Sequence, residues 1–221
     1  MMERKFIQYV IKPYNSLSSE LSKPWAQEPG LNDYLHSSIQ LATNIAHFPE
    51  QYLVNQGIKE RKNQYPKLEV LRQKYPSLSL MRDVSDIAKH GTLGSKNRET
   101  ESSVSTVMEV REDGMFRFIR NVIEVKYTVS GDVHDFMKDA YFVINALIDE
   151  YGFCDKNKVL PSTNQRLEFS NVCSLYFNHD REVAMSHSNI KFVKKNITGE
   201  FMPSNPPIGR VEWHELNQSS I

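Results

Sequence analysis

The sequence lacks the features that mark several large classes of protein. It has only two cysteines in 221 residues, Cys154 and Cys173, which is too few for a small secreted scaffold held by disulfides. It contains no apolar run long enough to span a membrane, and its N-terminus has no secretory signal pattern. We therefore expect a cytoplasmic globular protein that has no membrane partner.

The chain also lacks net charge. Its 27 basic and 27 acidic residues balance, so no overall field attracts nucleic acid or anionic lipid, and any RNA contact depends on a local basic patch. Two stretches are locally basic: Lys59, Arg61, Lys62, Lys67, Arg72 and Lys74 form one, and Lys191, Lys194 and Lys195 form the other. The alternative interpretation of these stretches is a solvated helix face and a charged edge strand.

Most well-known catalytic and metal-binding motifs are missing. The sequence has no glycine-rich phosphate loop, no G-x-S-x-G elbow, no H-E-x-x-H helix and no zinc-knuckle spacing. His179 and His187 flank a predicted hairpin and could ligate a metal together, but a third ligand is missing. We therefore predict neither a metal nor a cofactor.

Apolar residues recur at intervals of three and four through most of the first half, which predicts helices. Prolines and a glycine set the expected boundaries: the first long helix ends near Pro49, another segment opens at Pro66, and Ser77 caps a helix that ends at Gly91. A short helix or strand at residues 6–11 is expected to precede an irregular arm. The predicted long helices cover residues 31–48, 50–65, 66–75 and 77–91.

The second half begins with the alternating pattern of strands. Residues 104–129 predict an antiparallel hairpin or meander with a turn at Asp113 and Gly114, and a helix follows from Asp132 to Gly152. Weaker strand patterns lie at residues 172–177, 182–185 and 190–193. We expect an α+β fold, in which residues 1–152 form a helical domain with a β insertion at about 104–129, and residues 153–221 form a C-terminal strand-bearing extension.

The densest group of chemically active residues lies between Arg82 and His90. On a helix, Arg82, Asp86 and Lys89 share one face, while Asp83, Asp86 and His90 share an adjoining one. A histidine at a helix C-terminus beside cations could bind phosphate or act as a general acid. The alternative is structural, since an Arg82–Asp86 pair and a cationic helix end both stabilise a helix.

A second helix could bring further groups to the same place. If the helices pair antiparallel, His47 or Glu50 approaches the face that carries Arg82 and His90. The segment also resembles the R-D-x-x-N-x-x-K-H signature of uncharacterised bacterial and phage proteins, with Asp86 at the asparagine position. In those proteins the preceding helix often ends in a histidine and an acidic residue, and a strand-rich insertion and a closing helix follow.

These proteins in turn resemble the HEPN helical domains, many of which are ribonucleases or toxins with an R-x(4–6)-H motif. Seven residues separate Arg82 from His90, one more than in that motif. The resemblance implies a HEPN-like accessory or interaction protein of a bacterium or a mobile element, in a defence or toxin context, with a homo-oligomer or a protein partner. The two alternatives are a metal-independent endoribonuclease that uses Arg82 and His90, and a structural oligomer subunit. The predicted binding residues are Asp83, Asp86, Lys89, His47 and Glu50.

Overall fold

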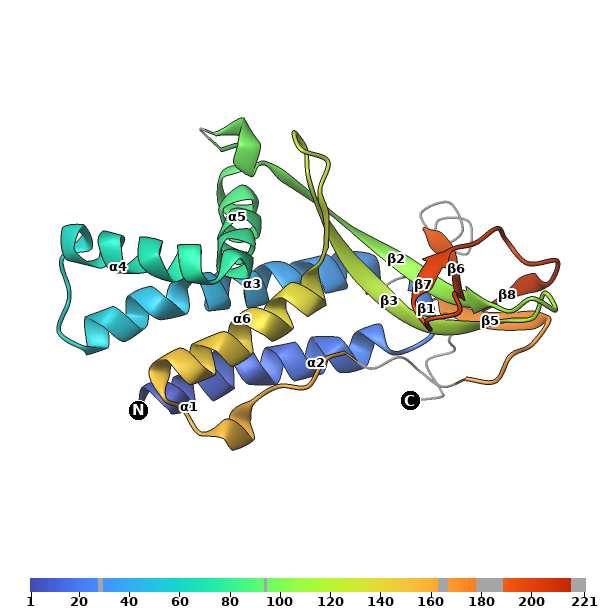
Figure 1. The fold of residues 1–221 in the computed structure, drawn as a ribbon, viewed down its shortest axis with the longest axis horizontal. Helices are drawn as coiled ribbons and strands as arrows, with labels where there is room; N and C mark the ends of the chain where they lie inside the picture. The colour runs from blue at the N-terminus through green and yellow to red at the C-terminus, as the bar shows by residue number, and fades with distance from the viewer. Residues whose placement is uncertain (28–29, 94, 163–166, 178–188, 216–221) are drawn as a thin grey trace. The chain divides into compact units, whose positions relative to one another are not determined.

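The computed structural model describes residues 1–27, 30–93, 95–162, 167–177 and 189–215 (Figure 1). These residues confirm the predicted α+β class, with a largely helical first half, a mixed five-stranded sheet and a smaller three-stranded sheet. No helix in these ranges is long and apolar enough to cross a membrane.

The chain forms two compact units, and each unit combines segments that are separated in the sequence. The helical unit consists of Met1–Leu17, His36–Ser102 and Glu124–Pro161, and the strand unit consists of Ser18–Leu35, Ser103–Ile123 and Ser162–Ile221. This division differs from the predicted one, in which the whole hairpin belonged to the helical domain. The end of the hairpin groups with the C-terminal segment because its strand at Thr106–Glu109 pairs in parallel with the strand that starts at Ile190.

The N-terminal segment is one helix rather than a short element and an arm. It comprises α1 (Met2–Phe6), the π-helical turn η1 (Ile7–Ile11) and α2 (Lys12–Leu21), so the predicted irregular arm is wrong up to residue 21. Pro13 has no N–H to bond the carbonyl of Tyr9. The side-chain amide of Asn44 donates to that carbonyl instead, at 2.9 Å, which lets the helix continue.

Two further predicted breaks at prolines are also wrong. Helix α3 (Gly30–Asn55) passes through Pro49, and α4 (Arg61–Lys74) contains Pro66. A proline removes one backbone hydrogen bond, but the apolar stripe of α3 is buried up to Phe48, and Tyr52 and Leu53 beyond Pro49 are half-buried, which outweighs that loss. The chain instead turns at Gly57, whose φ of 86° favours glycine.

Helix α5 (Pro76–His90) carries the Arg82–His90 segment. Pro76 occupies its first turn, and the predicted capping residue Ser77 instead donates a hydrogen bond to Asp139. The predicted end at Gly91 is confirmed, with a φ of 72°. Figure 1 shows α5 crossing α3 and α6 (Phe136–Tyr151) at a steep angle.

The closing helix starts later than predicted. Residues Val133–Asp135 form strand β4, which pairs with residues 124–126, so α6 begins at Phe136 instead of Asp132. Asp135 is its N-cap and accepts a hydrogen bond from the backbone N–H of Lys138 at 3.1 Å. The predicted end at Gly152 is confirmed. Phe6, Phe48 and α6 residues such as Ile144 are buried in the core of the helical unit.

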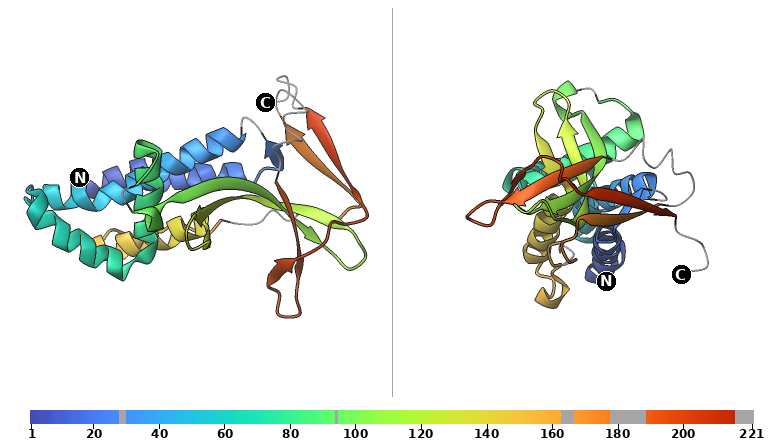
Figure 2. Two further views of the ribbon diagram at one scale, coloured as in Figure 1. Left: turned by 90° about the horizontal axis from the view of Figure 1, so that it is seen from above. Right: turned by 90° about the vertical axis from the view of Figure 1, so that its right-hand side faces the viewer.

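The predicted hairpin is confirmed as β2 (Thr100–Val110) and β3 (Phe116–Tyr127). The order in the five-stranded sheet is β4-β3-β2-β6-β7, where β6 is Ile190–Lys195 and β7 is Phe201–Pro203. The three-stranded sheet has the order β1-β5-β8 with parallel pairing, and comprises Trp25–Gln27, Val172–Phe177 and Arg210–Glu215. Figure 2 shows β5 and β8 side by side. The predicted strand at 182–185 lies outside the described residues.

Candidate functional site: a pocket lined by arginines and histidines

A pocket of about 460 Å³ lies in the helical unit between α3, α4 and α5. We call it the arginine pocket. Its lining residues are Ala46, His47 and Glu50 of α3, Arg61, Gln64, Tyr65, Leu68 and Arg72 of α4, and Arg82, Asp86 and His90 of α5. The site therefore collects side chains from three consecutive helices. Two of them, α3 and α5, contain residues that were predicted as site residues.

Five of the seven predicted site residues line this pocket. Arg82, Asp86 and His90 come from successive turns of α5, because a spacing of four residues keeps side chains on nearly the same helix face. His47 and Glu50 come from α3, but α5 crosses α3 steeply and does not form the antiparallel pair on which that prediction depended (Figure 1). The predicted convergence of cation, carboxylate and imidazole is thus present in the structure.

Lys89 does not line the pocket, but it contacts a residue that does. Its Nζ lies 2.6 Å from Nε2 of His47, while Nδ1 of His47 lies 3.1 Å from a carboxylate oxygen of Glu50. A lysine ammonium can only donate, so Nε2 of His47 accepts and its Nδ1 carries the proton that is donated to Glu50. Glu50 therefore orients the imidazole ring of His47, with Nε2 facing the ammonium of Lys89.

The pocket carries more positive than negative charge. Arg61, Arg72 and Arg82 line it together with only two carboxylates, those of Glu50 and Asp86. Arg61 makes no ion pair within the described ranges, and the nearest carboxylate to Arg72 is that of Glu69, 3.6 Å away. The pocket is therefore suited to an anion.

Arg72 shows most clearly how this charge is crowded. Its side chain is only 10% exposed. Burial lowers the pKa of Arg72, and the neighbouring guanidinium of Arg82 lowers it further. Arg82 itself lies 3.4 Å from Asp86, which it shares with a third arginine, Arg98. A bound anion would relieve the repulsion between the Arg72 and Arg82 side chains.

Asp83 does not line the pocket. It is 5% exposed, and it accepts hydrogen bonds from Nε of Arg98 at 2.7 Å and from the Tyr127 hydroxyl at 3.1 Å. Burial raises the pKa of Asp83, while the hydrogen bond from Arg98 lowers it. Arg98 also donates to Asp86 at 2.7 Å, so it bonds two carboxylates of α5, those of Asp83 and Asp86, without lining the pocket itself. The prediction of Asp83 as a binding residue therefore does not match its position, which is structural.

No role was predicted for Arg98, and Arg61 and Arg72 were not connected with the segment between Arg82 and His90. Arg98 lies in the expected polar loop, where its charge was the only available signal. Arg61 and Arg72 belong to the first basic patch, but the remaining lysines of that patch are outside this pocket. Lys62 pairs with Glu60 at 3.0 Å, and Lys74 pairs with Glu150 at 2.6 Å.

Among the described residues, no group of three or more histidine, cysteine, aspartate or glutamate side chains is placed to hold a metal ion. His179 and His187 lie outside those residues. No family model matches this sequence, and neither a curated protein nor a solved structure matches the chain. The interpretation of the site therefore depends on its own geometry.

Proposed function

We propose that the arginine pocket binds a phosphate group of RNA, and that the chain is a HEPN-like protein of bacterial or mobile-element origin. The observation that carries this proposal is the placement of three arginines and two histidines around one pocket that holds only two carboxylates. Planar guanidinium groups donate paired hydrogen bonds that match phosphate oxygens. Since the whole chain is neutral, such binding is local.

A second candidate function, metal-independent RNA cleavage, is favoured by the two imidazoles of the pocket. His47 has a basic Nε2 that is oriented through Glu50, and His90 lines the same pocket from α5. In this mechanism Lys89 moves from His47 to a phosphate oxygen, and His47 then accepts the proton of a ribose 2′-hydroxyl. The 2′-oxygen attacks phosphorus, and the departing 5′-oxygen takes a proton from protonated His90. The products are a 2′,3′-cyclic phosphate and a 5′-hydroxyl.

RNA binding is tested by fluorescence anisotropy with a labelled single-stranded RNA at several salt concentrations. We expect Arg61→Ala and Arg82→Ala each to weaken binding about tenfold and to reduce the salt dependence by about one unit, because each removes a phosphate contact. Lys62→Ala is the matched control on α4, since Lys62 lies outside the pocket. Unchanged affinity in both arginine variants would contradict the proposal.

Cleavage is tested with purified protein in EDTA, with light scattering to establish the oligomeric state. We expect His47→Ala and His90→Ala each to lower the cleavage rate about 100-fold or more, as for the loss of a general base or acid. His36→Ala, an exposed histidine of α3, is the control.

The absence of cleavage by folded protein would contradict the nuclease candidate and leave RNA binding as the function. If the His90→Ala and Asp86→Ala variants only lose stability, by about 1 kcal/mol or more, the segment is architectural. That result, combined with a stable oligomer and no RNA binding, would favour the structural-subunit alternative.

A further inference from the structure

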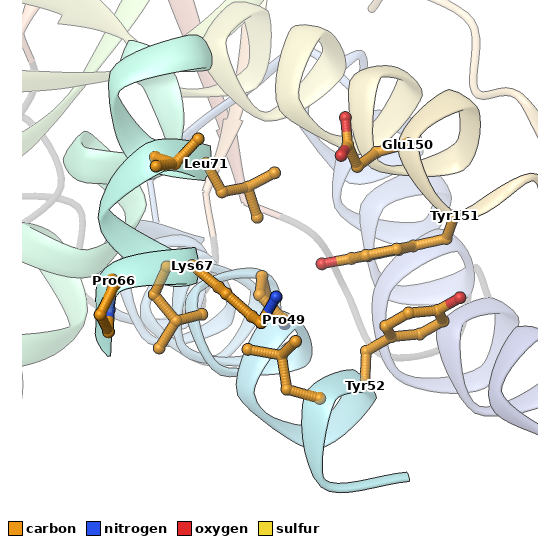
Figure 3. Close-up of a pocket in the computed structure, with 10 residues that line it drawn as sticks. Pro49, Tyr52, Pro66, Lys67, Leu71, Glu150 and Tyr151 are labelled. Atoms are coloured by element: carbon orange, nitrogen blue, oxygen red, sulfur yellow. The ribbon is translucent and has the colours of Figure 1, made fainter. Parts of the chain in front are cut away.

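A second pocket, of about 520 Å³, lies in the helical unit between α3, α4 and α6 (Figure 3). We call it the tyrosine pocket. It is lined by Pro49, Tyr52 and Leu53 of α3, by Pro66, Lys67, Leu68, Val70 and Leu71 of α4, and by Glu150 and Tyr151 of α6. Leu68 is the only residue that it shares with the arginine pocket. Its chemistry is therefore independent of the proposed RNA site.

The walls of this pocket are mostly apolar. Prolines and leucines of α3 and α4 form them, and Val70 at the edge is 64% exposed, so the pocket opens to solvent. Apolar pockets of a few hundred cubic ångströms with a few convergent polar groups are the usual form of a small-molecule site. The polar groups of this pocket consequently decide what it can bind.

Tyr151 supplies the first of these polar groups. Its ring stacks on Tyr52 with a centroid distance of 4.0 Å and an interplanar angle of 21°, which fixes the direction of the side chain. The hydroxyl points across the pocket toward α4 and has no hydrogen-bond partner within the described residues (Figure 3). Burial raises the pKa of Tyr151, and Glu150 raises it further, so the hydroxyl keeps its proton and can donate.

Glu150 and Lys67 supply the other two polar groups. One oxygen of Glu150 accepts from Nζ of Lys74 at 2.6 Å and from the Tyr75 hydroxyl at 3.0 Å, while the other oxygen, Oε1, has no partner in the described chain. The hydrogen bond from Lys74 lowers the pKa of Glu150, so Oε1 belongs to a carboxylate. The Lys67 side chain extends from α4 toward Pro49 and makes no ion pair with a described residue (Figure 3).

We propose that the tyrosine pocket binds a nucleotide, with the base between the apolar walls and the phosphate on Lys67. A nucleobase is planar and carries both donors and acceptors at its edge. The free oxygen of Glu150 can accept from a base N–H, and the Tyr151 hydroxyl can donate to a ring nitrogen or carbonyl oxygen. The Lys67 ammonium supplies the cation that a phosphate needs, and about 520 Å³ accommodates a nucleoside monophosphate.

The test is isothermal titration calorimetry of the full chain with AMP, GMP, CMP and UMP, supported by ligand-observed NMR. We expect at least one of the four to bind, and Tyr151→Phe to weaken that binding about fivefold or more through loss of one hydrogen bond. Lys67→Ala should weaken the nucleotide by a similar factor but leave the corresponding nucleoside unchanged. Tyr9→Phe and Lys62→Ala are the matched controls, since neither residue lines the pocket.

Three outcomes would overturn the proposal. The first is no binding of any of the four nucleotides at millimolar concentration, and the second is equal binding by unmodified protein, Tyr151→Phe and Lys67→Ala. The third is competition by inorganic phosphate as effective as that of the nucleotide, because it would mean that the base is not recognised.

Two further experiments distinguish this site from the arginine pocket and identify the source of the nucleotide. Binding should persist in Arg82→Ala; its loss there would place the nucleotide in the arginine pocket and overturn the proposal. A 5′-phosphorylated hexaribonucleotide that competes in a Tyr151-dependent manner would identify an RNA end as the source. Competition by mononucleotides alone would identify a free nucleotide, and both results support the site.

Discussion

The two pockets of the helical unit share α3 and α4 but have opposite chemistry. In the arginine pocket, α5 adds Arg82, Asp86 and His90. In the tyrosine pocket, α6 adds Glu150 and Tyr151 against walls that are largely apolar. The third helix thus adds polar groups of its own in each case, while α3 and α4 contribute side chains to both pockets.

Helix α4 itself shows how one element serves both pockets. Arg61, Tyr65, Leu68 and Arg72 follow one another at spacings of four, three and four residues and line the arginine pocket. The neighbouring stripe, with Lys67, Val70 and Leu71, lines the tyrosine pocket. One face of α4 is therefore polar and the neighbouring face is largely apolar, and the helix separates the proposed phosphate site from the apolar pocket.

Leu68 offers the most direct way to break this separation. It is 6% exposed and is the residue common to both pockets. We expect Leu68→Ala to lower the free energy of unfolding by about 3 kcal/mol, because the truncated side chain leaves a cavity among buried neighbours. The measurement is urea denaturation followed by circular dichroism, and RNA and nucleotide binding should both weaken in the same variant.

Val70→Ala is the matched control on the same helix. Val70 lines only the tyrosine pocket and is 64% exposed, so its truncation should change the free energy of unfolding by less than about 0.5 kcal/mol. RNA binding should be unchanged in this variant. If Leu68→Ala were equally mild, or impaired only one ligand, Leu68 would not be the element that joins the two sites.

Much of the arginine pocket could be predicted from sequence because helical periodicity is local. The spacing of Arg82, Asp86 and His90 places them on one helix face wherever that helix packs. His47 and Glu50 were expected beside them only if the helices paired antiparallel, and the structure brings them there through a steep crossing instead. Arg61 and Arg72 were missed because a helix start expected at Pro66 assigned them to different elements.

The prolines explain most of the errors in the helix boundaries. A proline costs one hydrogen bond and causes local crowding, but a sequence does not show what replaces the lost partner. At Pro13 the replacement is the amide of Asn44, a residue 31 positions away in the chain. The helix ends at Gly91 and Gly152 were predicted correctly because a left-handed glycine is a local requirement.

The tyrosine pocket left no signal in the sequence. Leu53, Leu68 and Leu71 follow the pattern of ordinary core residues, and a tyrosine is notable only when its hydroxyl lacks a partner. That lack is a property of the assembled helices, as is the division of the Glu150 carboxylate into one occupied and one free oxygen. Arg98 was missed for the same reason, since its partners lie 12 and 15 residues away on a helix.

Replacing Arg98 should have a smaller effect on stability than replacing Leu68, and it should affect ligand binding in only one of the two pockets. Arg98→Ala should lower the free energy of unfolding by about 2 kcal/mol at neutral pH, because it leaves the buried carboxylate of Asp83 without its cation. Asp86 would then pair with Arg82 alone, so RNA binding should weaken about twofold to threefold, while nucleotide binding in the tyrosine pocket should be unchanged. Arg111→Ala, which breaks the exposed pair with Asp113, is the control and should cost less than about 0.5 kcal/mol.

The pH dependence of this loss identifies its cause. Burial already raises the pKa of Asp83, and removing Arg98 takes away the strongest of the groups that lower it, so the folded variant binds a proton more strongly than the unfolded chain does. A carboxyl group whose folded pKa is raised destabilises the fold when it is ionised, and that cost disappears as the pH falls and the group is protonated. The difference between Arg98→Ala and the unmodified protein should therefore shrink between neutral and mildly acidic pH, as measured by urea denaturation at several pH values. A difference that stays constant would mean that Arg98 stabilises α5 by packing and not through the charge of Asp83.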